Sequence, residues 1–250
     1  MLLLLPPSET KEIGGSNLTI QQVHLSYGQL SDARDLILEK LLEVSRDAEL
    51  GARVLKLSKR QLDDLARNLE ILSAPTMPAY LRYSGTLYKA IEASKLTGEE
   101  VENVRRHVLM QSALFGLISA TDRIPWYRLS AESKLPNLDI KQVWQKAQPM
   151  AWARLTDSPI IDLRSKSYVE LSPVPEEMES YWVEVVSEVD GKRKALNHFN
   201  KKAKGELVGA FVRAKKTPET IAQLRKVAQS VGLDLYVEGR TLVLVTPEVV

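Results

Sequence analysis

The stretch that decides the fold is LMQSALFGLISATDRIPWYRL, residues 109–129. It opens with apolar residues typical of a buried strand, and Gly116 interrupts them. Four polar or charged residues then follow within seven positions: Asp122, Arg123, Tyr127 and Arg128. Because α/β folds tend to place sites just past the ends of buried strands, we expect Asp122, Tyr127 and Arg128 to contribute to one. A surface turn followed by a salt-bridged loop is the alternative interpretation.

A second buried strand is predicted at Met1–Leu5, where an apolar run stops at two prolines. The next residues offer a hydroxyl, a carboxylate and an amine: Ser8, Glu9 and Lys11. If the two strands are parallel neighbours, their following loops meet at one edge of the sheet. We therefore predict Glu9 or Lys11 within salt-bridge reach of Arg128 or Asp122. The alternative is a solvated turn.

A helical hairpin is predicted over about residues 31–72. Helices are expected at Ser31–Val44 and Ala48–Leu55, and the capping box Ser58–Gln61 starts a third, whose buried face would be Leu62, Leu65, Ala66 and Leu69. The tight turn before this third helix would expose backbone N–H groups that suit a phosphate, and Lys59 and Arg60 would add charge there. An ordinary helical hairpin remains the commoner explanation for such a pattern.

The remaining segments alternate between helical and strand patterns. Capping signals and apolar spacing predict further helices at Thr97–His107, at Ile140–Leu155 with a kink at Pro149, at Asn200–Phe211 and at Thr217–Gly232. Strands are predicted at Pro159–Leu163 and Tyr181–Val189, at Lys192–Phe199 after an Asp190-Gly191 turn, and in a hairpin over Asp234–Val245. The pattern predicts an α+β fold, with one compact domain over residues 1–250 and a mixed β-sheet flanked by helices.

A basic run lies between residues 192 and 216, a segment that contains nine Lys or Arg residues and a single acidic residue, Glu206. The net charge of +2 conceals this cluster. A solvated helix face is the usual explanation for such a run, but the density favours anion binding. We expect Lys201, Lys202 and Lys204 to contact phosphates.

Other functional classes lack their signatures. The chain has no cysteine, which excludes disulfides and thiol redox chemistry. Its three histidines, His24, His107 and His198, lie far apart, so we expect no metal site. No dinucleotide fingerprint or phosphate loop is present, and we expect no cofactor. No stretch approaches the roughly 20 apolar residues that span a bilayer, so we expect a soluble cytoplasmic protein.

Five blocks of sequence, taken in order, are spread along most of the chain: Leu3–Lys11, Tyr83–Tyr88, Ser112–Leu129, Ile161–Tyr168 and Phe199–Gly205. The first contains Pro-Pro-Ser-Glu-Thr-Lys, and the second carries Tyr83, Gly85 and Tyr88. Together the blocks resemble the YaaA peroxide-stress proteins, whose N-terminal motif has a Pro-Pro-Ser-Glu-Thr-Lys form. The chain departs from the family where Lys204 replaces the usual Arg, which keeps the charge but loses bidentate geometry.

The resemblance implies a protein that helps cells survive hydrogen peroxide and limits damage linked to free iron. It also implies binding to double-stranded DNA through a helix-hairpin-helix-like element. By position, that element would be the helical hairpin that carries Lys59 and Arg60.

Three functions remain open, and the third is a ligand-binding scaffold without chemistry. The first is a protein that binds DNA through phosphate contacts from Lys59, Arg60 and the basic run. The second is an enzyme that acts on nucleotides or damaged nucleic acid, and it ranks below the first because no catalytic mechanism follows from the motifs. The candidate pocket residues are Ser8, Glu9, Lys11, Tyr83, Gly85, Tyr88, Asp122, Tyr127 and Arg128.

Overall fold

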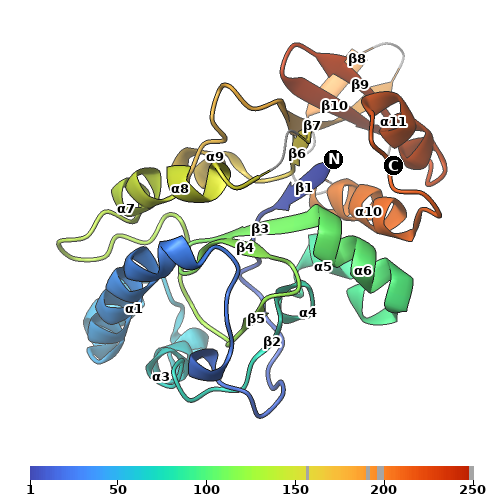
Figure 1. The fold of residues 1–250 in the computed structure, drawn as a ribbon. Helices are drawn as coiled ribbons and strands as arrows, with labels where there is room; N and C mark the ends of the chain where they lie inside the picture. The colour runs from blue at the N-terminus through green and yellow to red at the C-terminus, as the bar shows by residue number, and fades with distance from the viewer. Residues whose placement is uncertain (156–157, 190–191, 196–199, 248–250) are drawn as a thin grey trace.

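Strand β1 (Leu2–Leu5) lies within an eight-stranded mixed sheet of order β4-β3-β1-β6-β7-β10-β9, with β8 paired to β7 (Figure 1). Both neighbours of β1 run parallel to it: Leu3 pairs with Val108 and Leu4 with Asp162. The computed structural model describes residues 1–155, 158–189, 192–195 and 200–247. The other strands are β2 (Met77–Pro78), β3 (Val108–Ser112), β4 (Gly116–Ser119), β5 (Arg123–Ile124), β6 (Ile160–Asp162), β7 (Ser180–Val189), β8 (Lys192–Ala195), β9 (Asp234–Glu238) and β10 (Thr241–Thr246).

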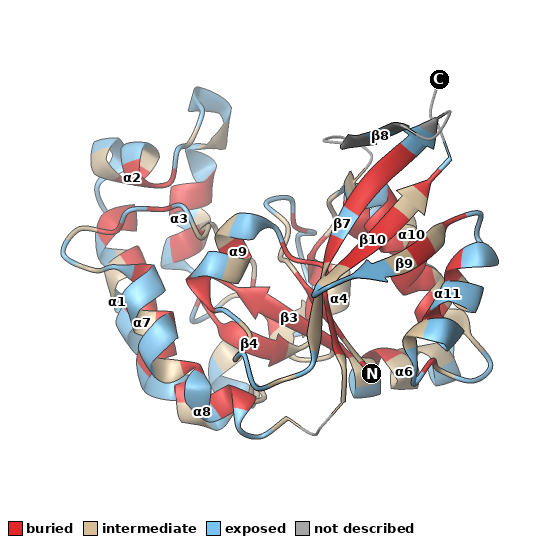
Figure 2. Ribbon diagram, turned by 90° about the horizontal axis from the view of Figure 1, so that it is seen from above, coloured by how far each residue is buried: buried red, intermediate tan, exposed pale blue. Residues whose placement is uncertain are grey.

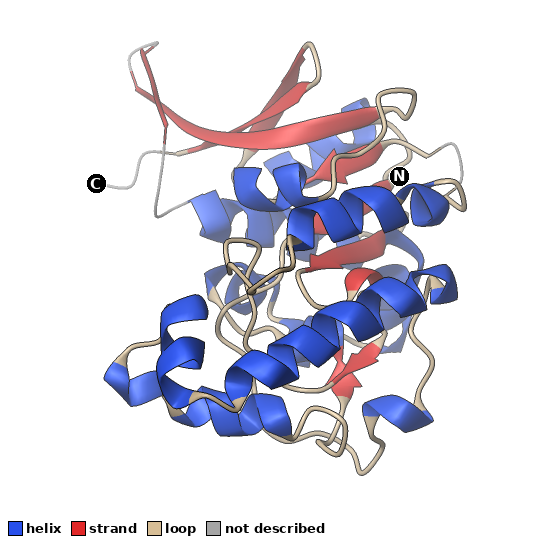
Figure 3. Cartoon of the chain, turned by 90° about the vertical axis from the view of Figure 1, so that its left-hand side faces the viewer, coloured by secondary structure: helices blue, strands red, loops and turns tan. Residues whose placement is uncertain are grey.

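Helices cover both faces of the sheet. Those after β1 are α1 (Ser31–Ser45), α2 (Ala48–Val54), α3 (Asp63–Leu69), α4 (Ala79–Arg82), α5 (Thr86–Ile91) and α6 (Gly98–His107). Those after β5 are α7 (Ile140–Ala147), α8 (Pro149–Trp152), α9 (Lys166–Leu171), α10 (Asn200–Arg213) and α11 (Ile221–Gln229). Helices α6 and α10 lie on one side and α1 and α7 on the other (Figure 1). Figure 3, viewed from the side of α1, shows helices in front of the stacked strands.

The central strands β1 and β3 are buried on both faces, and Figure 2 shows β3 in the colour of buried residues. Leu3, Leu4 and Leu5 of β1 are buried, and all of β3 is buried. A strand covered on both faces carries a continuous apolar run instead of an alternating pattern. This explains why the apolar run at residues 1–5 correctly predicted a buried strand.

For residues 109–129, the predicted buried strand is confirmed, but the predicted position of Asp122 is not. The first part of this stretch is strand β3, but the chain turns back at Gly116 and returns as β4, antiparallel to β3 with Leu109 opposite Ser119. Gly116 has a φ of +64°, and a Cβ there would lie 2.5 Å from the Trp144 ring, so this position needs glycine. The hairpin sends Asp122 to the opposite end of the sheet from Ser112.

Most predicted elements are confirmed, including the parallel neighbours β1 and β3, helices α1, α2, α6, α7 and α10, and the hairpin β9–β10. The helix expected from Ile140 breaks at Pro149 into α7 and α8. The start predicted at Thr217 is wrong, because Thr220 caps α11 and forms a capping box with Gln223. The Asp190-Gly191 turn and Phe199 lie outside the described residues.

The helical hairpin is present, but its buried face differs from the prediction. A single turn of 3-10 helix, Lys59–Gln61, precedes α3, and the capping box of Ser58 and Gln61 is present. Leu62, Ala66 and Leu69 were expected in the core but are exposed, Leu62 by 42% and Leu69 by 44%. Asn68 is buried instead, and its side-chain amide forms hydrogen bonds with the backbone of Arg128. Its equivalence to a helix-hairpin-helix element stays a prediction.

Helices α5 and α10 approach closely at Gly205, where an added Cβ would lie 2.2 Å from the carbonyl oxygen of Leu87. We therefore expect Gly205→Ala to destabilise the fold by about 1–3 kcal/mol, because it forces the two helices apart. Urea unfolding measures this change. Gly98→Ala is the control, since nothing lies within 4 Å of the Cβ that alanine would add there, and its stability should stay equal or rise by up to about 1 kcal/mol. Equal stability of both variants would contradict the close approach.

Candidate functional site

Loops from the carboxyl ends of three parallel strands meet at one edge of the sheet, after Leu5 of β1, Ser112 of β3 and Asp162 of β6. A cavity of about 400 Å³ opens beside the loops that follow β1 and β6. Six Ser and Thr side chains line it: Ser8, Thr10, Thr86, Ser130, Ser165 and Ser167. Flat or apolar walls come from Pro6, Pro7, Tyr88 and Tyr168. Its charged residues are Glu9, Glu132 and Lys201.

The predicted contact between the two polar loops is confirmed. The Glu9 carboxylate lies 3.0 Å from the Arg128 guanidinium, and the Arg128 side chain is only 15% exposed. The Arg128 backbone is fixed by the buried Asn68 amide, which accepts from the Arg128 N–H at 2.7 Å and donates to its carbonyl at 3.1 Å. Helix α3 therefore sets the position of the arginine that faces Glu9.

Lys11 is buried beneath this ion pair. Its ammonium donates to the Ser8 carbonyl at 2.8 Å and lies 4.4 Å from the centre of the Tyr127 ring. Burial lowers the pKa of Lys11 to about 7, although the Glu9 carboxylate acts in the opposite direction. The amine therefore exchanges its proton near neutral pH.

Three buried hydroxyl groups form a chain beside Lys11. Ser112 Oγ accepts from the N–H groups of Leu114 and Phe115, which occupies both of its lone pairs. Its own proton therefore goes to the Tyr127 hydroxyl at 2.8 Å, and the Tyr127 proton goes to the Tyr83 hydroxyl at 2.8 Å. Burial raises the pKa of Tyr83 to about 12, so the Tyr83 hydroxyl keeps its proton at neutral pH.

Two further predicted residues shape the cavity directly. The Tyr88 hydroxyl donates to the Pro6 carbonyl at 2.5 Å, which ties α5 to the loop after β1. Gly85 approaches Ser8 so closely that an added Cβ would lie 2.3 Å from Ser8 Oγ. Eight of the nine predicted pocket residues thus lie at or just behind this edge of the sheet.

Asp122 is the exception, and its assignment to the pocket is wrong. Its carboxylate accepts from the N–H and hydroxyl of Ser26 at 2.8 Å each and from the Ser119 N–H at 3.1 Å. These bonds hold loops at the other end of the sheet, where the β3–β4 hairpin delivers the chain.

The predicted basic residues divide into two groups. Lys59, Arg60, Lys201 and Lys202 are exposed, and the Lys202 amine lies 3.4 Å from the Glu206 carboxylate. Lys204 was expected on the surface, but it is 4% exposed and donates to the Leu163 carbonyl at 3.2 Å. Burial lowers its pKa to about 8. The buried position of Lys204 on α10 removes it from the surface that DNA could reach.

Several cavity residues were not predicted as site residues: Ser130, Glu132, Ser165 and Tyr168. Ser165 and Tyr168 fall within the fourth resembling block, which was therefore an available signal. Glu132 lies in an irregular loop, and no motif marks it.

Metal-binding clusters and membrane-spanning helices are both absent from the part of the chain that the structure describes. There, no group of three or more His, Cys, Asp or Glu side chains is placed to hold a metal ion. Among the same residues, no helix has both the length and the apolar character needed to cross a bilayer.

Comparison with known proteins links the chain to one family. The family model described as "Peroxide stress protein YaaA" matches residues 1–235. A UPF0246 protein of Corynebacterium efficiens is 39% identical over 98% of this chain and all of its own length. Another of Streptomyces coelicolor is 34% identical over 96% of this chain and 93% of its own length.

The lowered pKa of Lys11 predicts a pH-dependent stability. Between about pH 7 and the ordinary lysine pKa of 10.5, the folded amine is neutral while the unfolded amine is protonated. Unfolding then takes up a proton, so stability rises with pH, by at most about 1.4 kcal/mol per unit. We expect Lys11→Met to flatten this rise in urea unfolding between pH 7 and 9.5.

Lys202→Met is the matched control, because Lys202 is exposed and pairs with Glu206 on its own helix. Its stability should show the same pH slope as the unmodified chain. A Lys11→Met variant with an unchanged slope would refute the lowered pKa.

Proposed function

Because the chain belongs to the peroxide stress protein YaaA family, we propose that it serves the peroxide response by binding double-stranded DNA through largely sequence-independent phosphate contacts. The family supports the peroxide-stress role itself. The arrangement of exposed cations supports the DNA contacts.

One observation carries the proposal: two separate basic elements contact or line one cavity. Lys56, in the turn of the helical hairpin, forms a 3.0 Å ion pair with Glu132, which lines the cavity. Lys201, at the start of α10, lines the same cavity. The exposed pair Lys59 and Arg60 lies three and four positions beyond Lys56. A nucleic-acid backbone that crosses the cavity could therefore contact cations from both elements.

The chemistry of these cations favours phosphate over base contacts. Lysine acts as a point charge that suits phosphate oxygens, whereas base reading uses the fork of Arg or the amides of Asn and Gln. Three of the four exposed candidates are Lys. Phosphate contacts position a protein on DNA without reading its sequence.

Such contacts also suggest how damage linked to free iron could be limited. Cations that neutralise DNA phosphates release the counterions condensed there. When iron is free, Fe²⁺ is one of those counterions. We propose that the bound protein displaces it from the DNA surface, where peroxide would otherwise react with it.

A second candidate is an enzyme that acts on nucleotides or damaged nucleic acid, favoured by the position of Lys11. An amine with a pKa near 7 suits acid–base chemistry, and Glu9 and Arg128 lie at the same edge of the sheet. Turnover of an oxidised oligonucleotide that Lys11→Met abolishes would support this function, and no turnover by the unmodified chain would exclude it for that substrate.

The DNA proposal predicts a steep dependence of affinity on salt. Each phosphate contact contributes about −0.9 to the slope of log K against log salt. Replacing Lys201 and Lys202 with Ala should therefore flatten the slope by up to about two units, and so should replacing Lys59 and Arg60. The measurement is fluorescence anisotropy of a labelled duplex across a salt series.

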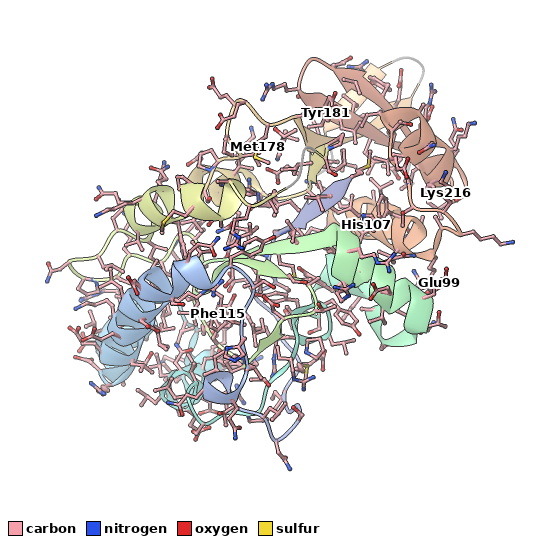
Figure 4. All side chains as sticks on the ribbon, viewed as in Figure 1. Glu99, His107, Phe115, Met178, Tyr181 and Lys216 are labelled. Carbon is pink, nitrogen blue, oxygen red and sulfur yellow. The ribbon has the colours of Figure 1, made fainter. Side chains whose placement is uncertain are left out.

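Replacement of Lys215 and Lys216 with Ala provides the matched control. Both are exposed lysines, and Figure 4 shows Lys216 on the side of α6 and α11, away from α1 and the hairpin. This control should keep the original slope. If all three double variants behave alike, the cations around the cavity do not form the DNA interface.

A further inference from the structure

The charges of the cavity leave one cation without an ionic partner. Glu9 pairs with Arg128 at 3.0 Å, and Glu132 pairs with Lys56 at 3.0 Å, so both carboxylates of the lining are neutralised from outside it. Lys201 is the remaining charged residue of the lining, and it has no ion pair among the described residues. The wall of the cavity therefore favours an anionic ligand.

The walls also provide surfaces for a flat, polar group. Two prolines and the rings of Tyr88 and Tyr168 offer apolar contact, and six Ser and Thr hydroxyls offer donors and acceptors. Nucleic-acid bases stack on such rings whatever their sequence. The volume of about 400 Å³ lies within the range of roughly 300–1,000 Å³ that is usual for small-molecule pockets.

We propose that this cavity binds a single nucleotide unit, with the base against the tyrosine and proline walls and the phosphate at Lys201. The unit can come from the free nucleotide pool or from a base that has left the stack of a bound duplex. The arrangement favours the duplex, because cations from two separate elements, the helical hairpin and α10, contact or line the cavity. This second source rests on the DNA-binding function proposed above.

Lys201 and Lys202 form a natural matched pair for the test. They are adjacent exposed lysines on α10, but only Lys201 is among the residues that line the cavity. Both should contribute equally to the salt slope for DNA. Only Lys201 should matter for a ligand inside the cavity.

The first experiment titrates the full chain with the fluorescent monophosphate of 2-aminopurine deoxyriboside and with the deoxyriboside alone. We expect the monophosphate to bind more tightly than the nucleoside. Lys201→Met should lower the affinity for the monophosphate by about tenfold, the loss expected for one charge-assisted hydrogen bond. Lys202→Met should change this affinity by less than about twofold. Ala131→Trp places a large side chain in the lining of the cavity, so it should lower the affinity for both ligands.

The second experiment compares a perfectly paired duplex with one that carries a single mismatch. A base is more easily unstacked at a mismatch, so a duplex source predicts tighter binding there. Excess monophosphate should remove this preference, and so should Lys201→Met. Equal affinity for the two duplexes, with the monophosphate still bound, would assign the free nucleotide as the ligand.

The outcomes separate the two proposals. Monophosphate binding without DNA binding would refute the proposed function and retain the nucleotide site. DNA binding with a salt slope that both lysine variants flatten, but with no monophosphate binding, would refute the nucleotide site and retain the proposed function. Monophosphate affinity that is equal in Lys201→Met and Lys202→Met would also overturn the assignment of Lys201.

Discussion

The parallel pairing of β1 with β3 on one edge and β6 on the other is the constraint on which the site depends. It requires a strand buried on both faces, which the apolar residues 2–5 provide. Because all three strands point the same way, loops that are distant in sequence leave the sheet together. Glu9 meets Arg128 only because the strand that precedes Glu9 pairs in this direction.

Buried cations recur around this edge, and backbone carbonyls stabilise most of them. Arg82 donates to the carbonyls of Ile124, Glu12, Gly14 and Pro75, and so joins loops from three parts of the chain. Lys11 and Lys204 each donate to one carbonyl. A buried charge is costly unless it is hydrogen-bonded, so these contacts offset part of the cost of burial. The same interior explains the lowered pKa values of both lysines.

Sequence patterns predicted the strands and helices whose apolar spacing is local, and they brought Glu9 and Arg128 together correctly. They misplaced Asp122 because a glycine in a strand pattern does not reveal that the chain reverses there; the φ of +64° at Gly116 does. They placed Lys204 on the surface because a charge run hides which lysine faces inward. Its carbonyl partner, Leu163, is 41 residues away in sequence. Glu132 had no local signal, since its role follows from an ion pair with Lys56 across 76 residues.

The ion pair between Lys56 and Glu132 is one link between the helical hairpin and the cavity, beside the buried contact of Asn68 with Arg128, and its exposure limits how much coupling it can carry. Its side chains are 64% and 63% exposed, so the pair contributes at most about 1 kcal/mol and is screened by salt. Coupling between two sites is a reciprocal free energy. Through this contact, occupancy of the cavity can change affinity at the hairpin, and the reverse, by no more than about fivefold. With respect to this contact, the two surfaces therefore behave as nearly independent modules, each free to change in evolution without disabling the other.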